Sequence, residues 1–421
     1  MTEATAASNE DLQGSRSPCP PLPLPPPLMG SDEGSFAHYT VSERLPAIVE
    51  RVITENDFRP PIVENLQALA DELPVGLVRL LKDDDGPDMA AWAGYLEPYL
   101  GQRWLDLPWY FAEAYFYRRI LEATEYFSPG PSNGVDPFET EKHAGLESAM
   151  GSIRALAARA NDLVRQSGRA NRAGLITLTY FALWGNRVDL SLWPAGSQGD
   201  DRSRVELHRE QEKILVDDTP VLADKVTRLR GARIDFIADN AGFELVCDLC
   251  LADFLLSCGA AGTVHLHLKA HPTFVSDTMM KDVEYTLKTL ADDQDLEVRA
   301  LAARLQGYVN ADRLQLRERM FWTAPLAFWE VPDAMREDLR EAALIFVKGD
   351  ANYRRLLGDR HWPFTTRLAD IVCYFPVPLA ALRTLKSELA AGLQPGQPEE
   401  VAREDPNWLT NGRWGVIQLV P

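Results

Sequence analysis

An acid and an amide follow a short apolar run at residues 234–238, where Asp239 and Asn240 precede Gly242 and a helix-like sequence. In open α/β sheets, ligands bind beyond the carboxyl ends of the strands, so Asp239 and Asn240 are predicted to lie at the mouth of a site. Carboxylate and amide oxygens suit Mg²⁺ or Mn²⁺. The pattern therefore favours metal-assisted chemistry on an anionic substrate. The alternative is a strand-end turn in which both residues only cap the next helix.

Two further carboxylates extend this candidate site. Glu244 falls in the first turn of the predicted helix, where it either faces the same site or complements the helix dipole. Asp277 follows Ser276 just past the next apolar run, at 263–269. A carboxylate at the end of a neighbouring strand would complete a divalent-cation site with positions open to water. Taken alone, a Ser-Asp pair is a common helix cap.

A basic and polar loop follows a third apolar run. It contains Lys348, Gly349 and Asp350, with Asn352 and Arg354 soon after. Glycine permits a tight turn, and arginine can grip a phosphate with two donors. Asp350 and Asn352 could bind sugar hydroxyls. The alternative is a solvated loop with ordinary helix capping.

A pair of cations, Arg383 and Lys386, follows a strand predicted at 370–375. On a helix predicted over 378–390 they are three residues apart and share a face, which suits an anion. The alternative is a cationic helix surface.

Two metal-like patterns favour structural roles. Cys247 and Cys250 lie in a strongly apolar helical run, which is typical of buried core cysteines. Polar residues alternate with apolar ones up to residue 271, which places one set on a single strand face: His265, His267, Lys269 and His271. The chain has no Gly-x-Gly-x-x-Gly, no Walker-type lysine loop and no Gly-x-Ser-x-Gly, so familiar nucleotide and serine-hydrolase motifs are missing.

The amino-acid composition argues against some classes of binding partner. The 421 residues carry 62 acids against 43 bases, a formal charge of −19, which opposes binding to nucleic acid or to an anionic membrane. Five cysteines form an odd, sparse set that is typical of a reduced intracellular protein. No apolar run is long enough for a membrane span, and the N-terminus does not match a secretory signal. A cytoplasmic protein is expected; the sequence indicates no oligomeric state.

The elements that must position these residues divide the chain into three predicted parts: a disordered Pro-rich tail at 1–36, a helical region at 37–190, and a catalytic α/β/α domain at 191–421. Strands are predicted at 233–238, 263–269, 343–347, 370–375 and 416–420, and helices between them at 242–257, 278–291, 295–308 and 378–390. This alternation favours a three-layer α/β/α sandwich around a mostly parallel sheet. Residues 190–215 are predicted to form a loop.

Four segments in this order resemble the metal-dependent damage-control phosphatases: Asp239-Asn-Ala-Gly-Phe-Glu244, His271-Pro-x-Phe-Val-Ser-Asp277, Lys348-Gly-Asp-x-Asn-Tyr-Arg354 and Arg383-Thr-x-Lys386. The last is typical of the Arg-Thr-x-Lys subfamily. Upstream stretches agree, among them Glu43-Arg-Leu-Pro46 and Leu183-Trp-Gly-Asn-Arg187, so the resemblance runs from about residue 36 to 418. Each motif is short, but the ordered set is specific.

The resemblance implies a helical N-terminal region joined to a Rossmann-like α/β/α domain. It implies metal ligands at Asp239, Asn240 and Asp277, with Mn²⁺, Co²⁺, Ni²⁺ or Mg²⁺ as the ion. It also implies a small phosphorylated metabolite as substrate, such as fructose 1-phosphate or fructose 6-phosphate. The positions implied to bind the phosphate or sugar are Glu43, Arg44, Asp350, Asn352, Tyr353, Arg354 and Lys386. Glu244 is a further candidate for substrate contact.

The expected chemistry is attack of an activated water on phosphorus, with the metal, Lys386 and Arg354 stabilising the transition state. Asp239 is a candidate nucleophile only if it is free of metal. The rival hypothesis is a carboxyl methyltransferase using S-adenosylmethionine and acting on protein glutamate, because a human family member also carries the name acidic residue methyltransferase. A third hypothesis is a protein-interaction scaffold that uses the Pro-rich tail.

Overall fold

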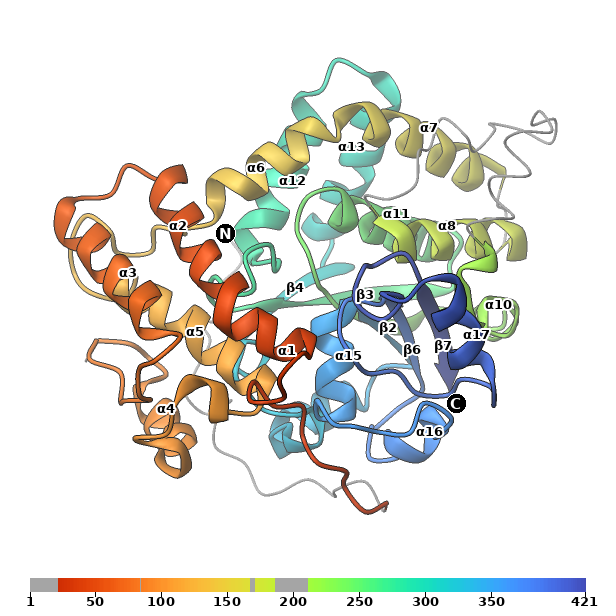
Figure 1. Cartoon of the computed structure of the whole chain (residues 1–421). Coiled ribbons are helices and arrows are strands. Elements are labelled where there is room, and N and C mark those ends of the chain that lie inside the picture. The colour runs from red at the N-terminus through yellow and green to blue at the C-terminus, as the bar shows by residue number, and fades with distance from the viewer. Residues whose placement is uncertain (1–21, 84, 167–170, 186–210) are drawn as a thin grey trace.

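The fold was analysed in a computed structural model that describes residues 22–83, 85–166, 171–185 and 211–421 (Figure 1). Its centre is a seven-stranded sheet with strand order β1-β7-β6-β5-β2-β3-β4. The strands are β1 (Ile214–Asp217), β2 (Ala232–Ile237), β3 (Ala261–Lys269), β4 (Leu314–Arg319), β5 (Leu344–Lys348), β6 (Leu379–Thr384) and β7 (Gly415–Val420). All neighbours are parallel except β6 and β7, which are antiparallel. The predicted mostly parallel sheet is confirmed.

Alternate residues of the central strands enter two different hydrophobic clusters. Along β5, Leu344 and Phe346 belong to one cluster, whereas Ile345 and Val347 belong to the other. This alternation follows from the pleat, which sends successive side chains to opposite faces. Both faces of β5 are buried, as expected of a strand covered by helices on each side.

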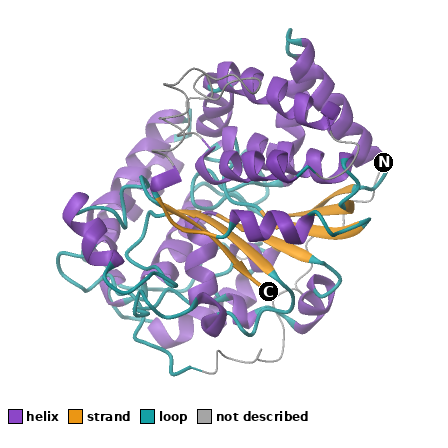
Figure 2. Cartoon of the chain, turned by 90° about the vertical axis from the view of Figure 1, so that its right-hand side faces the viewer, coloured by secondary structure: helices purple, strands orange, loops and turns teal. Residues whose placement is uncertain are grey.

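Helices cover both faces of the sheet, as Figure 2 shows. The layer on one face comprises α10 (Thr219–Val226), α11 (Phe243–Ser257), α12 (Met280–Asp292) and α13 (Leu296–Asn310), and residues of α6 (Glu139–Ser148), α7 (Met150–Gln166) and α8 (Arg172–Trp184) share its hydrophobic cluster. The other face is covered by α14 (Asp333–Leu339), α15 (Gly349–Leu357), α16 (Leu368–Ile371) and two 3₁₀ turns, η7 (Met320–Thr323) and η8 (Phe328–Glu330). The helix α17 (Gln397–Glu404) follows β6. The predicted three-layer α/β/α architecture is confirmed.

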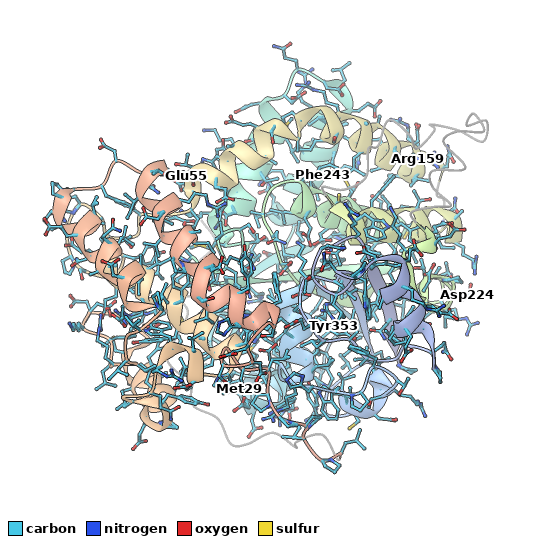
Figure 3. The ribbon with its side chains drawn as sticks, viewed as in Figure 1. Met29, Glu55, Arg159, Asp224, Phe243 and Tyr353 are labelled. Atoms are coloured by element: carbon cyan, nitrogen blue, oxygen red, sulfur yellow. The ribbon has the colours of Figure 1, made fainter. Side chains whose placement is uncertain are left out.

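A helical N-terminal region lies beside the sheet (Figure 1) and packs into the hydrophobic cluster that contains Ile345 and Val347 of β5. It contains α1 (Phe36–Tyr39), η2 (Thr40–Arg44), α2 (Leu45–Glu55), α3 (Pro60–Glu72), α4 (Met89–Leu96), η3 (Glu97–Tyr99), η4 (Trp104–Asp106) and α5 (Trp109–Ala123). Helix α2 buries Leu45, Ile48, Val49 and Val52, the single face that its sequence period predicts. Helix α5 is buried on nearly all sides because it lies between the other helices and the sheet layers. Side chains fill the space between these parts (Figure 3).

The chain around β6 differs from the prediction. Residues 370–375 contain the end of the short helix α16 and a turn rather than a strand, and residues 379–384 form strand β6 rather than a helix. The run Leu379–Thr384 is rich in leucine and alanine, which are good helix formers, but burial between β5 and β7 decides for strand. Strands β1 and β4, both at the sheet edges, were not predicted. The predicted loop at 190–215 lies largely outside the described residues.

The prediction of a disordered tail is wrong for residues 22–36, which contact the rest of the chain, whereas residues 1–21 lie outside the described residues. Leu28 is buried and its backbone joins two distant parts: its N–H donates to the Asp359 carbonyl at 2.9 Å, and its carbonyl accepts from the Trp109 N–H at 2.8 Å. The carbonyl of Pro25 accepts from Arg360. The segment therefore links α5 to the loop after α15. Among the described residues, no helix is long and apolar enough to cross a membrane.

Candidate active site

Four adjacent parallel strands, β6, β5, β2 and β3, bring the predicted polar segments to one edge of the sheet. Asp239 and Asn240 follow β2, and the backbone of Asn240 pairs with Asp277, which follows β3. The Asp239 carbonyl also accepts hydrogen bonds from the N–H and the hydroxyl of Thr278, at 2.8 and 3.0 Å. The loops after β2 and β3 are thus tied to each other, which fixes the spacing of their acidic side chains.

Helix α15 begins directly after β5, where a loop was predicted, and its first residue approaches Asp239 so closely that it must be glycine. Gly349 has φ +81°, and a Cβ at this position would lie 1.8 Å from the Asp239 carboxylate. Any other side chain would be strained and would displace the carboxylate. Gly349 therefore serves the geometry of Asp239 as well as the turn into α15.

Asp350 connects the loops after β5 and β6. Its Oδ1 accepts from Arg383 Nε at 2.7 Å, from the Lys386 N–H at 3.0 Å and from the Ser387 hydroxyl at 3.0 Å. Arg383 is buried and its other donors bind the carbonyls of Leu389 and Ser387. The predicted shared helix face of Arg383 and Lys386 is wrong, because Arg383 lies in a strand and holds the loop that presents Lys386.

These loops line a cavity of about 490 Å³. The predicted site residues that line it are Arg44, Asp239, Asn240, Asp277, Asp350, Arg354 and Lys386. We call the part contributed by Asp239, Asn240, Asp277, Asp350 and Lys386 the strand-end wall. The sheet therefore collects segments that are far apart in the sequence into one hollow.

The opposite side of the cavity comes from the N-terminal helices and α6. We call it the helical wall; it comprises Arg44, Arg51, Glu113, Tyr117 and Glu141. Only Arg44 among these was predicted. A signal for Arg51 was present in the sequence: positions 44, 47, 48 and 51 share one helix face, and all four line the cavity.

Several predicted residues do not line this cavity. Glu43 is exposed, and Glu244 lines an adjoining hollow of about 300 Å³ that shares Asn240 and Lys386 with the first. Asn352 is fully buried, where its amide binds the carbonyls of Ala238 and Lys348 at 2.9 Å.

Two more predicted residues, Tyr353 and Lys348, are buried and stabilise the loops through contacts in the protein interior. Tyr353, labelled in Figure 3, is buried, and its hydroxyl donates to Gln418 at 2.8 Å. Lys348, considered for phosphate, is buried; it pairs with Asp248 at 2.9 Å and also donates to the Ala182 carbonyl. Both hold the strand ends in place.

Arg354 lines the cavity but is largely committed to protein partners. Its Nε donates to Asp359 at 2.7 Å, a terminal nitrogen pairs with Glu113, and the guanidinium lies 3.7 Å from the centre of the Trp109 ring. By contrast, neither Arg44 nor Lys386 makes a side-chain hydrogen bond or ion pair with the described part of the chain. These two are the cations best placed to meet an anionic ligand.

The acidic cluster fits a divalent cation. Burial raises the pKa of Asp239 well above its ordinary value, and the neighbouring charges of Glu244 and Asp277 raise it further. Burial also raises the pKa of Asp277, although its ion pair with Lys269, with Oδ2 3.0 Å from the ammonium, opposes this rise. Crowded buried carboxylates of this kind are surroundings that a bound cation would stabilise.

The amide of Asn240 must turn to join such a site. Its Nδ2 donates to Asp239 at 2.8 Å and to Glu244 at 2.9 Å, while its Oδ1 accepts from Ser276 at 2.6 Å. Binding a metal requires Oδ1 to face Asp239. No group of three or more His, Cys, Asp and Glu in the described ranges is arranged to hold a metal, so this candidate depends on the amide.

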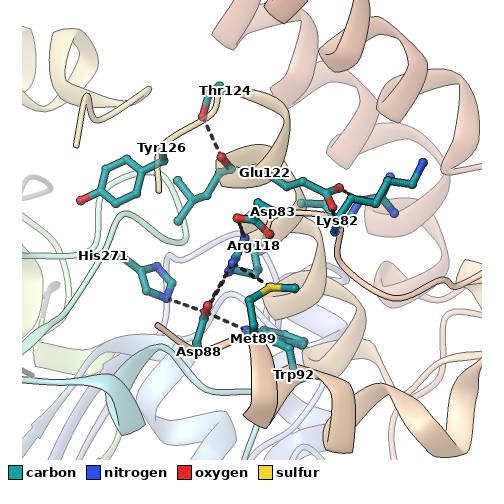
Figure 4. A network of polar contacts seen from close by, with 12 residues as sticks. Lys82, Asp83, Asp88, Met89, Trp92, Arg118, Glu122, Thr124, Tyr126 and His271 are labelled. Carbon is teal, nitrogen blue, oxygen red and sulfur yellow. Dashed lines mark hydrogen bonds and ion pairs between the residues drawn. The ribbon is translucent and has the colours of Figure 1, made fainter. Parts of the chain in front are cut away.

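A buried polar network anchors the loop that carries Asp277 (Figure 4). His271, at the start of the loop, lies 3.8 Å from Asp88, and Asp88 binds Arg118 at 2.8 Å. Arg118 also pairs with Asp83 at 2.8 Å. Burial lowers the pKa of His271 to about 4, so the imidazole is neutral at neutral pH. The network fixes the loop to the helical region.

The two metal-like patterns lie where the sequence placed them, except that His271 lies beyond the end of β3, in the loop that leads to Asp277. Cys247 and Cys250 are buried in the core of α11, and burial raises the pKa of both thiols. His265, His267 and Lys269 lie on β3, where His267 binds Asp235 at 2.9 Å.

Known proteins resemble this chain over most of its length. Residues 40–401 match the family model described as the damage-control phosphatase ARMT1-like domain. The chain is 34% identical to damage-control phosphatase ARMT1 of Danio rerio, covering 94% of this chain and 97% of that protein. It is 34% identical to the Mus musculus protein of the same name, with coverage of 93% and 98%, and 32% identical to the Homo sapiens protein, with coverage of 94% and 98%. A solved DUF89 family structure from Pyrococcus horikoshii aligns with a TM-score of 0.47 at 15% identity, covering 90% of this chain and 97% of that chain.

The family match and these relatives, which cover most of the chain, support a phosphatase role in metabolite repair. The chain belongs to the damage-control phosphatase ARMT1-like family.

Proposed function

We propose that the protein is a metal-dependent phosphomonoesterase that hydrolyses sugar phosphates such as fructose 1-phosphate and fructose 6-phosphate. The observation that carries this proposal is the cavity in which a buried acid-amide cluster lies with two uncommitted cations, Arg44 and Lys386. A divalent cation between the carboxylates and the phosphoryl group would neutralise negative charge on both. The cations would bind the remaining phosphoryl oxygens.

Asp239, Asn240 and Asp277 would hold the divalent ion, with Mn²⁺, Co²⁺, Ni²⁺ and Mg²⁺ as candidates for such oxygen-rich ligands. When bound, the ion would neutralise phosphoryl charge and lower the pKa of a water molecule. Lys386 would stabilise charge on the phosphoryl oxygens in the transition state. Arg383 and Asp350 would hold the Lys386 loop in position.

Water then adds to phosphorus and the P–O ester bond breaks, so that the sugar leaves as an alcohol and inorganic phosphate is released. Asp350 is placed to bind a sugar hydroxyl, since only its Oδ1 has partners among the described residues. Burial raises the pKa of Asp350, but the charges of Arg383 and Arg354 outweigh it and the pKa is lowered. The carboxylate is therefore an ionised acceptor.

Methyl transfer has less support. The turn after β2 carries Asp239 and Asn240, and neither β1 nor β2 is followed by a glycine-rich phosphate-type turn. The scaffold hypothesis is weakened by the burial of Leu28 and Gly30, which packs part of the Pro-rich segment against the rest of the chain.

The test is phosphate release by metal-stripped protein across a sugar-phosphate panel, with and without each ion. We expect release that depends on metal and is lost in Asp239→Ala, while Asp292→Ala, an exposed acid on α12, keeps wild-type activity. Release that persists in Asp239→Ala with excess metal would refute the site. Absence of release with every ion would refute the activity.

A further inference from the structure

Tyr117 of α5 has an unusual position at the helical wall. Its side chain is 3% exposed, and it lines the 490 Å³ cavity. The ring packs against Phe274 with centroids 4.9 Å apart and against Phe138 at 5.9 Å. These contacts fix the direction of the phenol.

The hydroxyl of Tyr117 makes no hydrogen bond with the residues that the structure describes. Buried tyrosine hydroxyls usually have a partner, because leaving one unpaired is costly. Tyr115, two residues earlier, follows this rule and donates to the Arg79 carbonyl at 2.6 Å. A buried hydroxyl that opens only onto a cavity indicates a partner that enters the cavity.

The surroundings of Tyr117 keep the phenol protonated. Burial raises its pKa, Glu113 and Asp277 raise it too, and Arg44 and Arg51 oppose them. The group is therefore neutral near pH 7, able both to donate and to accept a hydrogen bond. Glu113, on the same helix, is already paired with Arg354. Tyr117 is thus the uncommitted hydrogen-bonding group that α5 presents to the cavity within the described structure.

The loop between β3 and Asp277 helps to hold Tyr117. Phe274 and Val275 have φ values of 45° and 64°, which are uncommon for residues with a Cβ and most unusual for a β-branched one. This conformation places the Phe274 ring against both Tyr110 and Tyr117. Strain of this kind persists where the surrounding structure requires it, often at ligand sites. One loop therefore positions both a predicted metal ligand and the phenol.

We infer that Tyr117 is a specificity-determining residue whose hydroxyl binds a hydroxyl group of the sugar part of the substrate. The inference rests on the proposed phosphatase function and adds how the non-phosphoryl part is recognised. The phosphoryl oxygens have the cations as partners, whereas a neutral group that both donates and accepts matches a polyol hydroxyl. A site built to bind a hydroxyl discriminates strongly against substrates that lack it.

The test is Tyr117→Phe, which keeps the ring and removes only the hydroxyl, with Tyr110→Phe as the matched control. Tyr110 lies on the same helix and also contacts Phe274, but it does not line this cavity. We expect kcat/KM of Tyr117→Phe for a hexose phosphate to fall about tenfold. Its kcat/KM for p-nitrophenyl phosphate, which has no hydroxyl groups, its inhibition by inorganic phosphate and its Tm should match wild type, as should all values for Tyr110→Phe.

Unchanged kinetics with hexose phosphates would overturn the inference, and so would an equal loss with both substrates, since that would place Tyr117 at the phosphoryl group or in the scaffold. If wild type releases no phosphate from any sugar phosphate, the proposed function falls. The role of Tyr117 is then decided by calorimetric binding of a hexose phosphate, where equal Kd values for wild type and Tyr117→Phe would overturn it.

Discussion

The two walls of the cavity differ in how they are built. The strand-end wall consists of short loops that leave neighbouring parallel strands, and its side chains are fixed by bonds within and between those loops, such as Asp350 to Arg383. The helical wall comes from η2, α2, α5 and α6, and the packing of these helices positions its side chains at the cavity. Groups suited to metal and phosphate lie mainly on the first wall. The second wall carries the aromatic and hydroxyl groups suited to the rest of a substrate.

This difference indicates that chemistry and substrate choice can change separately. Substitutions of Asp239, Asp277 or Lys386 in the strand-end wall should lower activity with every phosphate ester. Substitution of Tyr117 in the helical wall should alter the ranking of substrates. The following predictions test that division, starting with the largest expected effect.

Replacing Lys386 by Ala should lower kcat/KM about 10²- to 10³-fold, because a cation facing the phosphoryl oxygens is lost. The loss should be similar for sugar and aryl phosphates. Steady-state kinetics on both substrate types measure it, with Lys288→Ala, an exposed lysine of α12, as the control. A loss confined to sugar phosphates would move Lys386 from the phosphoryl group to the sugar.

Gly349→Ala should lower activity about a hundredfold and stability by about 1–3 kcal/mol, since the new Cβ meets the Asp239 carboxylate and the backbone has positive φ. Kinetics and denaturant unfolding report the two effects. Gly307→Ala is the matched control: this glycine lies in α13 with open space around it, and alanine should stabilise the helix there by about 0.5–1 kcal/mol. Normal activity in Gly349→Ala would contradict the close approach.

Leu28→Ala should lower the free energy of unfolding by about 2–3 kcal/mol, because the side chain is buried between α5 and the loop after α15. Leu24→Ala, at a position 37% exposed, should change it by less than about 0.5 kcal/mol. The measurement is urea unfolding. Equally small changes in the free energy of unfolding for both variants would mean that the Pro-rich segment does not contribute to stability.

Acid should weaken the link between the two walls through His271. Its folded-state pKa of about 4 lies below the ordinary 6.5, so the unfolded chain takes up the proton first. The stability contributed by the neutral imidazole is complete above pH 6.5 and is lost as pH falls toward 4, at up to about 1.4 kcal/mol per pH unit. Unfolding measured at several pH values should show a shallower decline in His271→Gln. Parallel curves would exclude His271 as a cause.

The contrast between the strand-end wall and the helical wall also explains which site residues could be predicted from the sequence. Asp239, Asn240 and Asp277 follow apolar runs within a few residues, so strand–turn–helix order alone placed them at one sheet edge. Lys386 was placed on a helix, because the short run of β6 has helix-forming residues and its burial depends on β5 and β7. Tyr117 and Glu141 could not be assigned at all, since their position depends on contacts between distant segments, such as Tyr117 with Phe274.

The most direct test of the account is a crystal structure of the protein with Mn²⁺ and inorganic phosphate. The account predicts anomalous signal from manganese between Asp239 and Asp277, with the Asn240 carbonyl oxygen turned toward it. It also predicts phosphate in contact with Lys386 and free space beside Tyr117. Manganese bound elsewhere, or phosphate seated against Tyr117, would contradict the division of the cavity into a phosphoryl side and a sugar side.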